Sequence, residues 1–233
     1  MRKEPFTVGS YVHVIKRGVR GTNIVRDEID RWRFILMPRH FNDDYISENW
    51  FRDLMDEKIA HTLNRPAIWP KQKKIVNILC YTLLDNHFHL LLQEIQEGGI
   101  SKFMQKLGAG MTNCFNQKYK ERGSLFQGAY KSRTVEDDVY LRYLSVYIQV
   151  KNSFELYHGG IKKASDYFEK AYDWAVNYPY CSLGGYAGLR ESPLIDKGIL
   201  GEMFTPAEYK DFSKDFITGY SAKIEMLPMA GFE

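Results

Sequence analysis

Residues 74–94 read KIVNILCYTLLDNHFHLLLQE, and this stretch decides the fold. The segment from Lys74 to Leu84 is strongly apolar and predicts a β-strand. Asp85 and Asn86 are a turn signal, and the segment from His87 to Glu94 predicts a second strand that runs back along the first. The sequence therefore predicts a β-hairpin near the middle of the chain.

Strands and helices alternate on both sides of this hairpin. A β-branched and aromatic run predicts a strand before it, and runs of apolar residues at helical spacing predict the helices. Pro38 is expected to end the first helix, and Asp137 is part of an amino-terminal capping arrangement for the helix that begins at Glu136. In chain order we predict a strand at 11–17, helices at 27–37 and 44–63, the hairpin, a helix at 101–122, a strand at 129–135, and helices at 136–156, 165–177 and 206–218.

This order of elements defines a fold class. Strand, helix, two strands, helix and strand is the split βαβ order of a ferredoxin-like (RRM-like) α+β sandwich. One more helix, at 136–156, follows it. We therefore expect a domain at residues 8–157 and a mildly acidic, helical C-terminal extension at residues 158–233 that is not an independent domain.

The composition is that of a globular protein. The chain has 233 residues, of which 44% are hydrophobic and 26% charged, which excludes disorder, collagen and a small disulfide scaffold. No apolar run approaches the ~18 residues of a membrane span, and the amino end lacks a signal-peptide pattern. We expect a cytoplasmic protein with three reduced cysteines and no membrane partner.

The net charge of +3 hides a strongly basic segment. From Lys102 to Arg133, seven basic residues stand against one acid, Glu121, which gives a local charge of +6. Positive charge among aromatic residues is typical of a nucleic-acid site, although solvated helix faces produce such runs about as often. The candidate DNA-binding residues are Arg17, Lys71, Lys73, Lys74, Lys102, Lys106, Lys118, Lys120, Arg122, Lys131 and Arg133.

His87 and His89 are the strongest candidates for chemistry. Successive side chains of a strand alternate, so both imidazoles project from one face while Phe88 and Leu90 face the helices on the other. Two imidazoles on one face can chelate one divalent metal, and no cysteine pair offers a closed zinc site. We treat His13, on the first strand, as a sheet-surface residue that could lie beside this pair, and His40 as a surface residue.

The helix at 136–156 carries a stripe of tyrosines. Tyr140, Tyr143 and Tyr147 lie at helical spacing, a pattern that is more often core than catalysis. A tyrosine can nevertheless attack a phosphodiester, and the resulting phosphotyrosine retains the energy of the broken bond. Because the phenol has an ordinary pKa of about 10, a metal that polarises the phosphate would assist the attack.

Three segments carry a resemblance to a known family. Asn86-His-Phe-His-Leu-Leu91 resembles the His-hydrophobic-His (HUH) signature of single-tyrosine, IS200-like transposases, particularly their REP-associated branch. Gly123-Ser-Leu-Phe-Gln-Gly-Ala-Tyr-Lys-Ser-Arg133 resembles the conserved segment that follows in that family, and Tyr147-Ile148 resembles the start of its Tyr-Ile-x-x-Asn-Pro motif. Arg17-Gly18 after the first strand also fits. The resemblance covers residues 8–157 and leaves the extension out.

The resemblance implies a DNA nicking and joining enzyme that acts on single-stranded DNA folded as a hairpin. His87 and His89 would hold Mg²⁺ or Mn²⁺ at the scissile phosphate, and Tyr147 would form a 5′-phosphotyrosine. In the family an Asn or Gln four residues after the tyrosine is the third metal ligand, and here that position is Lys151. Asn152, one residue late, Gln149, two residues early, or a water molecule could complete the shell; otherwise the metal site is weakened. Whether Tyr147 serves its own site or that of a partner in a homodimer stays open.

Two other functions compete with this interpretation. The same split βαβ order supports sheets that bind RNA or DNA without cleaving it, so a non-catalytic binding module, such as a domesticated transposase or a regulator, is the alternative. The other is a metal-dependent nuclease in which water attacks the phosphate, so that free 5′-phosphates form and no protein adduct accumulates.

Overall fold

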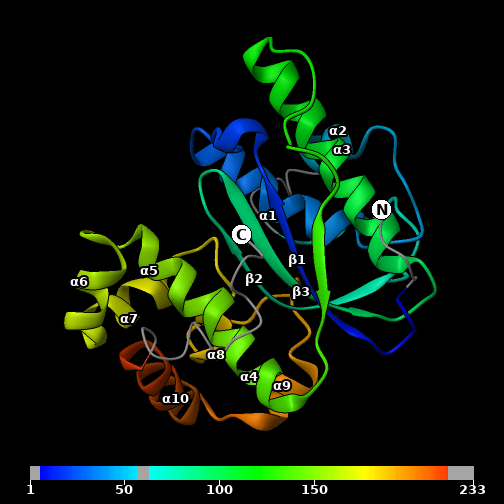
Figure 1. Cartoon of the computed structure of the whole chain (residues 1–233). Helices are drawn as coiled ribbons and strands as arrows, with labels where there is room; N and C mark the ends of the chain where they lie inside the picture. Colours follow the sequence, from blue (N-terminus) through cyan, green and yellow to red (C-terminus); the bar gives the residue numbers. More distant parts are fainter. Residues whose placement is uncertain (1–5, 57–62, 220–233) are drawn as a thin grey trace.

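A four-stranded antiparallel sheet lies at the centre of the protein (Figure 1). The computed structural model describes residues 6–56 and 63–219. The strands are β1 (Tyr11–Arg17), β2 (Val76–Leu83), β3 (His87–Glu94) and β4 (Lys131–Thr134), and they lie in the order β2-β3-β1-β4. With helices between β1 and β2 and one helix between β3 and β4, this is the ferredoxin-like topology, so the predicted fold class is confirmed.

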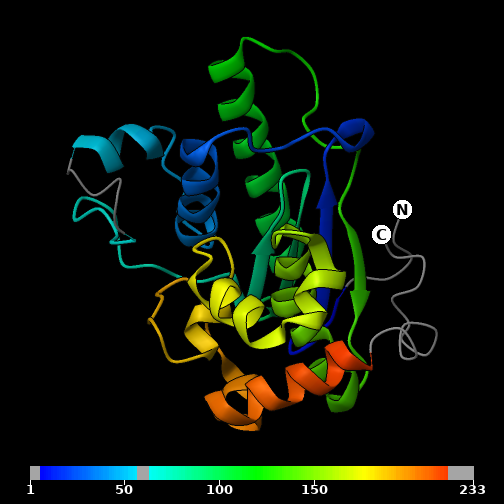
Figure 2. The ribbon, with the colours of Figure 1, turned by 90° about the vertical axis from the view of Figure 1, so that its left-hand side faces the viewer.

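Helices α1 (Glu28–Phe41) and α3 (Gly99–Tyr119) cover one face of the sheet, and α2 (Trp50–Asp56) lies beyond α1, farther from the strands (Figure 2). Phe88, Leu90 and Leu92 of β3 pack with apolar residues of α1 and α3 in one fully buried core. The carboxyl end of α3 extends beyond the sheet in both views (Figures 1 and 2). We call this the helical face.

Two expectations for this face are wrong. Pro38 does not end the first helix, which runs on to Phe41. The helix continues because Met37, Pro38 and His40 are all buried, so tertiary packing outweighs the hydrogen bond that proline removes. The helix expected at 44–63 is present only as α2, preceded by bends and turns, and residues 57–62 lie outside the described part of the chain.

The opposite face of the sheet lies against α4 (Asp138–Val146), a π-turn labelled η2 (Tyr147–Lys151) and α5 (Asn152–Leu156). Figure 1 shows these helices in front of the sheet and α1 behind it. Asp137 caps α4 by accepting a hydrogen bond from the Tyr140 amide at 2.7 Å. The continuous helix predicted at 136–156 is therefore interrupted by one π-turn. We call this the histidine face, because His87 and His89 lie on it.

The C-terminal extension forms α6 (Gly160–Asp166), α7 (Phe168–Asn177), α8 (Leu183–Tyr186), α9 (Gly198–Met203) and α10 (Pro206–Thr218). The helix expected at 206–218 is confirmed, and the one expected at 165–177 is present as α7, which begins at Phe168, whereas Ser165 and Asp166 belong to α6. Residues of α7, α8 and α10 share a second buried core with α4, η2 and α5 (Figure 2).

The extension also pairs with the open edge of the sheet. Cys181 forms an isolated antiparallel β-bridge with Thr82. The Ser182 amide donates to the Tyr81 carbonyl at 3.0 Å, and the Leu83 amide donates to the Tyr180 carbonyl at 3.0 Å. The domain boundary at residue 157 stays a prediction. Within the described residues, every helix is too short or too polar to cross a bilayer.

Candidate active site

His87 and His89 lie side by side on the histidine face. In the antiparallel pairing of β3, His87 is opposite Arg17, and His89 is opposite Ile15 on one side and Thr82 on the other. Paired residues of antiparallel strands share a face, so these side chains project together. The two imidazole rings lie 5.0 Å apart between centroids.

Hydrogen bonds orient both rings through Nδ1. Nδ1 of His87 lies 2.6 Å from the Asn86 side-chain oxygen, which can only accept, so Nδ1 donates. Nδ1 of His89 lies 2.9 Å from Nε2 of His13, whose ring stacks on that of His89. When Nδ1 of each ring carries the proton, Nε2 keeps its lone pair, as in metal-binding histidines whose other nitrogen is held by a neighbour.

All three imidazoles are held neutral. Burial and then the Arg17 guanidinium lower the pKa of His87 to about 4. Burial and then Arg133 lower the pKa of His13 to about 3, and burial followed by His13 holds the pKa of His89 well below its usual value. The neutral imidazole is the form that binds a metal, so protons do not compete for these nitrogens near pH 7.

Tyr147 faces this cluster from the start of the π-turn. Its ring lies edge-on to those of His89 and His13, with centroids at 5.8 and 6.3 Å, and the residue is 4% exposed. Tyr143 instead packs on rings of α10, so the expected tyrosine stripe does not share one set of contacts.

The π-turn changes which residue follows Tyr147 on the same side of the helix. In an α-helix a residue five positions on is rotated by roughly 140°, at about 100° per residue. Here the Asn152 amide donates to the Tyr147 carbonyl, an i to i+5 bond that absorbs one extra residue. The turn brings Asn152 toward the position that the fourth residue after the tyrosine has in a regular helix.

The three polar residues near this turn have different surroundings. Gln149 is fully buried, donates from Nε2 to the Tyr209 hydroxyl at 2.7 Å and accepts from Ser182 Oγ at 2.6 Å. Both ends of its amide are therefore bound by the C-terminal extension. Asn152 is also fully buried, but neither of its side-chain polar atoms has a hydrogen-bond partner among the described residues.

Lys151 stands where the family pattern has its amide ligand. It is 6% exposed, its ammonium pairs with the Glu155 carboxylate, and Nζ lies 4.7 Å from the centroid of the Tyr147 ring. A fixed cation therefore lies against the tyrosine.

In a metal site here, the ligand that joins His87 and His89 must be a group other than a carboxylate, a thiol or another imidazole. Within residues 6–56 and 63–219, no three His, Cys, Asp or Glu side chains converge to hold a metal ion. His89 Nε2 and the Asn152 amide oxygen are, however, buried polar atoms without hydrogen-bond partners. Such atoms are costly unless something binds them; an amide oxygen suits Mg²⁺ or Mn²⁺, and an imidazole is a ligand of divalent transition metals. The residues fit the divalent cation that the sequence motifs imply.

Three of the predicted DNA-binding residues flank the histidines. Arg133 and Lys131 of β4 are opposite His13 and Ile15 of β1, so they project from the histidine face together with Arg17. A hollow of about 660 Å³ lies beside them. Arg17 and Lys131 line it, with Arg20 of the 3₁₀ turn η1 (Val19–Gly21).

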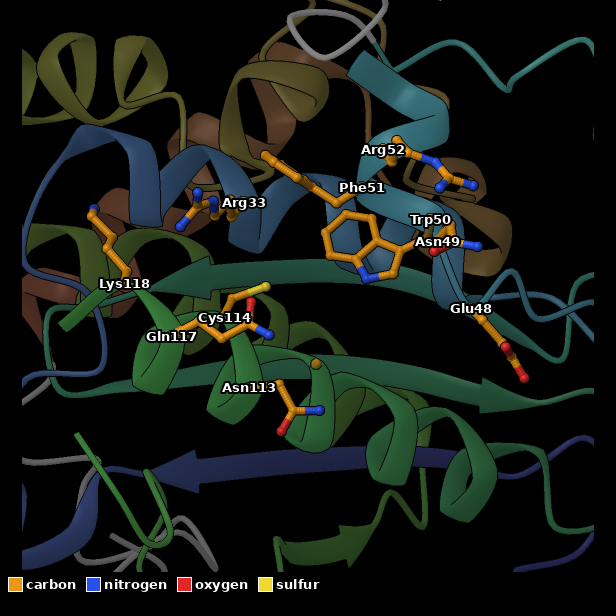
Figure 3. Close-up of a pocket in the computed structure, with 11 residues that line it drawn as sticks. Arg33, Glu48, Asn49, Trp50, Phe51, Arg52, Asn113, Cys114, Gln117 and Lys118 are labelled. Carbon is orange, nitrogen blue, oxygen red and sulfur yellow. The ribbon is translucent and has the colours of Figure 1, made fainter. Parts of the chain in front are cut away.

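The lysines of α3 lie elsewhere. The helix packs on the helical face, so its charges do not reach the histidines, and each of its lysines has a partner. Lys118 pairs with Asp27 at 2.5 Å and Asp30 at 2.7 Å. It borders a hollow of about 530 Å³ between α1, α2 and α3 (Figure 3). The other two are Lys102, which pairs with Asp44 at 2.8 Å, and Lys106, which donates to the Asp43 carbonyl.

The remaining basic candidates are exposed and lie in loops. Lys71, Lys73 and Lys74 precede β2, and Lys74 lies 3.8 Å from an Asp196 oxygen. Lys120 and Arg122 follow α3, at the end that extends beyond the sheet. None of the five belongs to the histidine face of the sheet.

Two histidines lie in places that the sequence did not indicate. His13 is 1% exposed and part of the cluster, although we expected it on the sheet surface. Its odd-numbered place on β1, opposite Leu91 and therefore on the same face as His89, was the available signal. His40 is wrongly expected at the surface, since it is 2% exposed and its ring lies edge-on to Trp69.

The fold and the site together define the class of protein: a ferredoxin-like domain with a histidine pair on the sheet and a tyrosine facing it from the following helix. Residues 49–151, slightly less than half of the chain, match the family model described as "Transposase IS200 like". The matched region contains His87, His89 and Tyr147, and the match agrees with the resemblance that these motifs carry.

Other comparisons add a distant structural likeness. One similar solved structure is that of "the REP associates tyrosine transposase bound to a REP hairpin", with 13% identity, a TM-score of 0.46, and coverage of 85% of this chain and 90% of that one. No curated protein matches the chain.

Proposed function

We propose that the protein nicks and rejoins single-stranded DNA hairpins through a covalent 5′-phosphotyrosine at Tyr147. The observation that carries the proposal is His89, whose ring adjoins those of His87 and Tyr147 and whose buried Nε2 has no hydrogen-bond partner among the described residues. The equally unpartnered Asn152 side chain follows the π-turn that begins at Tyr147. His87, His89 and Asn152 would hold Mg²⁺ or Mn²⁺. When bound, the cation polarises the scissile phosphate and withdraws negative charge from it.

The residues of the chain supply the other parts of the reaction. The Tyr147 oxygen forms the new bond to phosphorus, the bond from phosphorus to the sugar 3′ oxygen breaks, and the freed 3′ hydroxyl takes up a proton. Rejoining reverses these steps with a new 3′ end. The Lys151 ammonium lies against the Tyr147 ring, so a fixed cation stands beside the proposed nucleophile.

Arg17, Lys131 and Arg133 would bind the single strand beside the histidines. They share the histidine face, and the hollow next to them is large enough for a nucleotide. Phosphate contacts position a strand without reading its sequence, so the hairpin that is recognised must be read elsewhere on the protein.

The test is a hairpin oligonucleotide labelled at its 3′ end, incubated with the protein and Mn²⁺ and separated in denaturing gels. We expect a covalent protein–DNA band that Tyr147→Phe abolishes while DNA binding persists. Tyr143→Phe is the matched control, because this tyrosine of the same helix packs on α10 and should leave the band unchanged.

The rivals give different products in the same gel. A band that persists in Tyr147→Phe would refute the nucleophile. Free 5′-phosphates without an adduct would indicate a hydrolytic nuclease. Binding that is insensitive to EDTA and to His87→Ala, without any cleavage, would indicate a binding module.

A further inference from the structure

The backbone of the π-turn is held by side chains from distant parts of the chain. Thr82 of β2 donates its hydroxyl hydrogen to the Ile148 carbonyl. The Gln149 carbonyl accepts from Ser153 Oγ at 2.7 Å and from Cys181 Sγ at 3.3 Å. A π-turn breaks the regular i to i−4 ladder, and such interruptions persist where side chains bind the freed groups.

The Gln149 side chain is fixed from two sides by the C-terminal extension. Tyr209 of α10 accepts from Gln149 Nε2 and lies 3.2 Å from Ser145 Oγ in α4, and Ser182 donates to Gln149 Oε1. The contacted residues, Ser145 and Gln149, lie on either side of Tyr147. All four side chains of this network are buried, with exposed fractions of 3% or less: Ser145, Gln149, Ser182 and Tyr209.

Ser182 and Tyr209 are themselves held by further hydrogen bonds of the fold. Ser182 belongs to the segment that pairs with the edge of β2, and its Oγ also accepts from the Tyr81 amide at 2.9 Å. Tyr209 lies in the first turn of α10, which begins with a complete capping box of Thr205 and Glu208. The sheet edge and α10 therefore offer a fixed frame against which the turn is held.

We propose that the C-terminal extension is a clamp, formed by Cys181, Ser182 and Tyr209, that keeps the π-turn in its i to i+5 register and thereby positions Asn152 and Tyr147. The proposal rests on the proposed function, because it assigns the clamp to that site. It gives the extension, which lies outside the family match at 49–151, a role in the reaction.

The chain has a physical need for such a clamp. π-turns are rare because their hydrogen bonding is less favourable than that of an α-helix, so a free segment of this sequence would wind as α-helix. That change would rotate Asn152 away from the side of Tyr147. Burial raises the pKa of the Cys181 thiol, which keeps the thiol protonated and able to donate to the Gln149 carbonyl.

The test compares two tyrosines of the same core. Tyr209→Phe removes the hydroxyl that holds Gln149, whereas Tyr172→Phe removes a buried hydroxyl that has no hydrogen-bond partner among the described residues. Mn²⁺ binding to the whole chain is measured by calorimetry without DNA. We expect Tyr209→Phe to weaken Mn²⁺ affinity about tenfold, as loss of an outer-shell partner does, and Tyr172→Phe to leave it unchanged.

Amide hydrogen exchange of residues 147–152 in the metal-free protein is the second readout. It should rise in Tyr209→Phe relative to Tyr172→Phe. If Tyr209→Phe does not fold, Cys181→Ala takes its place, with Cys80→Ala as the control from the same buried core. Equal exchange and equal Mn²⁺ affinity in variant and control would overturn the clamp.

A rescue experiment separates register from general stability. Deleting Lys151 removes the extra residue, so the turn can close as α-helix with an asparagine four residues after Tyr147 and the flanking helices in place. In this background Tyr209→Phe should change Mn²⁺ affinity by less than about twofold; a tenfold loss that persists would overturn the register argument. If the unaltered chain binds no Mn²⁺ and forms no adduct, the proposed function fails, while the exchange comparison still decides the clamp.

Discussion

Replacing Asn152 with leucine should stabilise the metal-free protein while it destroys the metal site. Asn152 is fully buried and its amide lacks hydrogen-bond partners among the described residues. An unsatisfied buried polar group costs about 1–3 kcal/mol, and a leucine of similar shape removes this cost. The free energy of unfolding should therefore rise by up to ~1–3 kcal/mol, and Tm by about 2–4 °C per kcal/mol for a chain of this size.

Gln149→Leu is the matched control with the opposite sign. Gln149 is equally buried, three positions earlier, but both ends of its amide are hydrogen-bonded. Leucine there leaves Tyr209 and Ser182 short of a partner and should lower the free energy of unfolding by about 1–3 kcal/mol.

The assay is urea unfolding followed by circular dichroism, with and without Mn²⁺. At a hundred times its dissociation constant, Mn²⁺ should stabilise the unaltered chain by about 2.7 kcal/mol and Asn152→Leu hardly at all. If Asn152→Leu destabilises the metal-free protein as much as Gln149→Leu does, then the Asn152 amide is satisfied in solution. The case for it as a ligand then fails.

Two other predictions follow from charge. Burial and, to a smaller extent, Arg39 lower the pKa of His40 in the folded protein to about 4. The unfolded chain therefore binds a proton at His40 at a higher pH than the folded chain, and the free energy of unfolding falls as the pH drops below about 6.5. His40→Met should reduce the loss between pH 7 and pH 5 by about 2 kcal/mol in urea titrations, and an unchanged pH slope would contradict the burial of this ring. Arg17→Ala should reduce the slope of log K against log salt for single-stranded DNA by about 0.7, while Lys102→Ala, whose lysine is paired with Asp44, should leave it unchanged. Equal slopes for the two variants would place the strand on the other face.

The sequence was sufficient for the fold because its signals are local. β-branched and apolar runs bounded by turn residues determine the strands, and the order of elements then allows few topologies. Pro38 was misjudged because a breaker signal is also local, whereas the buried residues around it are held by helices distant in sequence. The ion pairs of α3 were missed for the same reason: Lys118 and Asp27 are 91 positions apart.

The third ligand is the case in which sequence reasoning could only leave alternatives open. Counting residues from Tyr147 assumes a helical period, and with 3.6 residues per turn Lys151 is the residue on the right side of the helix. The period itself changes here, because Thr82, Cys181 and Ser153 bind backbone carbonyls of the π-turn. Thr82 and Cys181 come from segments distant in sequence. Only the tertiary structure therefore shows that the π-turn accommodates one extra residue. The inserted residue is Lys151, whose ammonium lies against the Tyr147 ring, and the candidate ligand Asn152 follows it, with its backbone amide donating to the Tyr147 carbonyl.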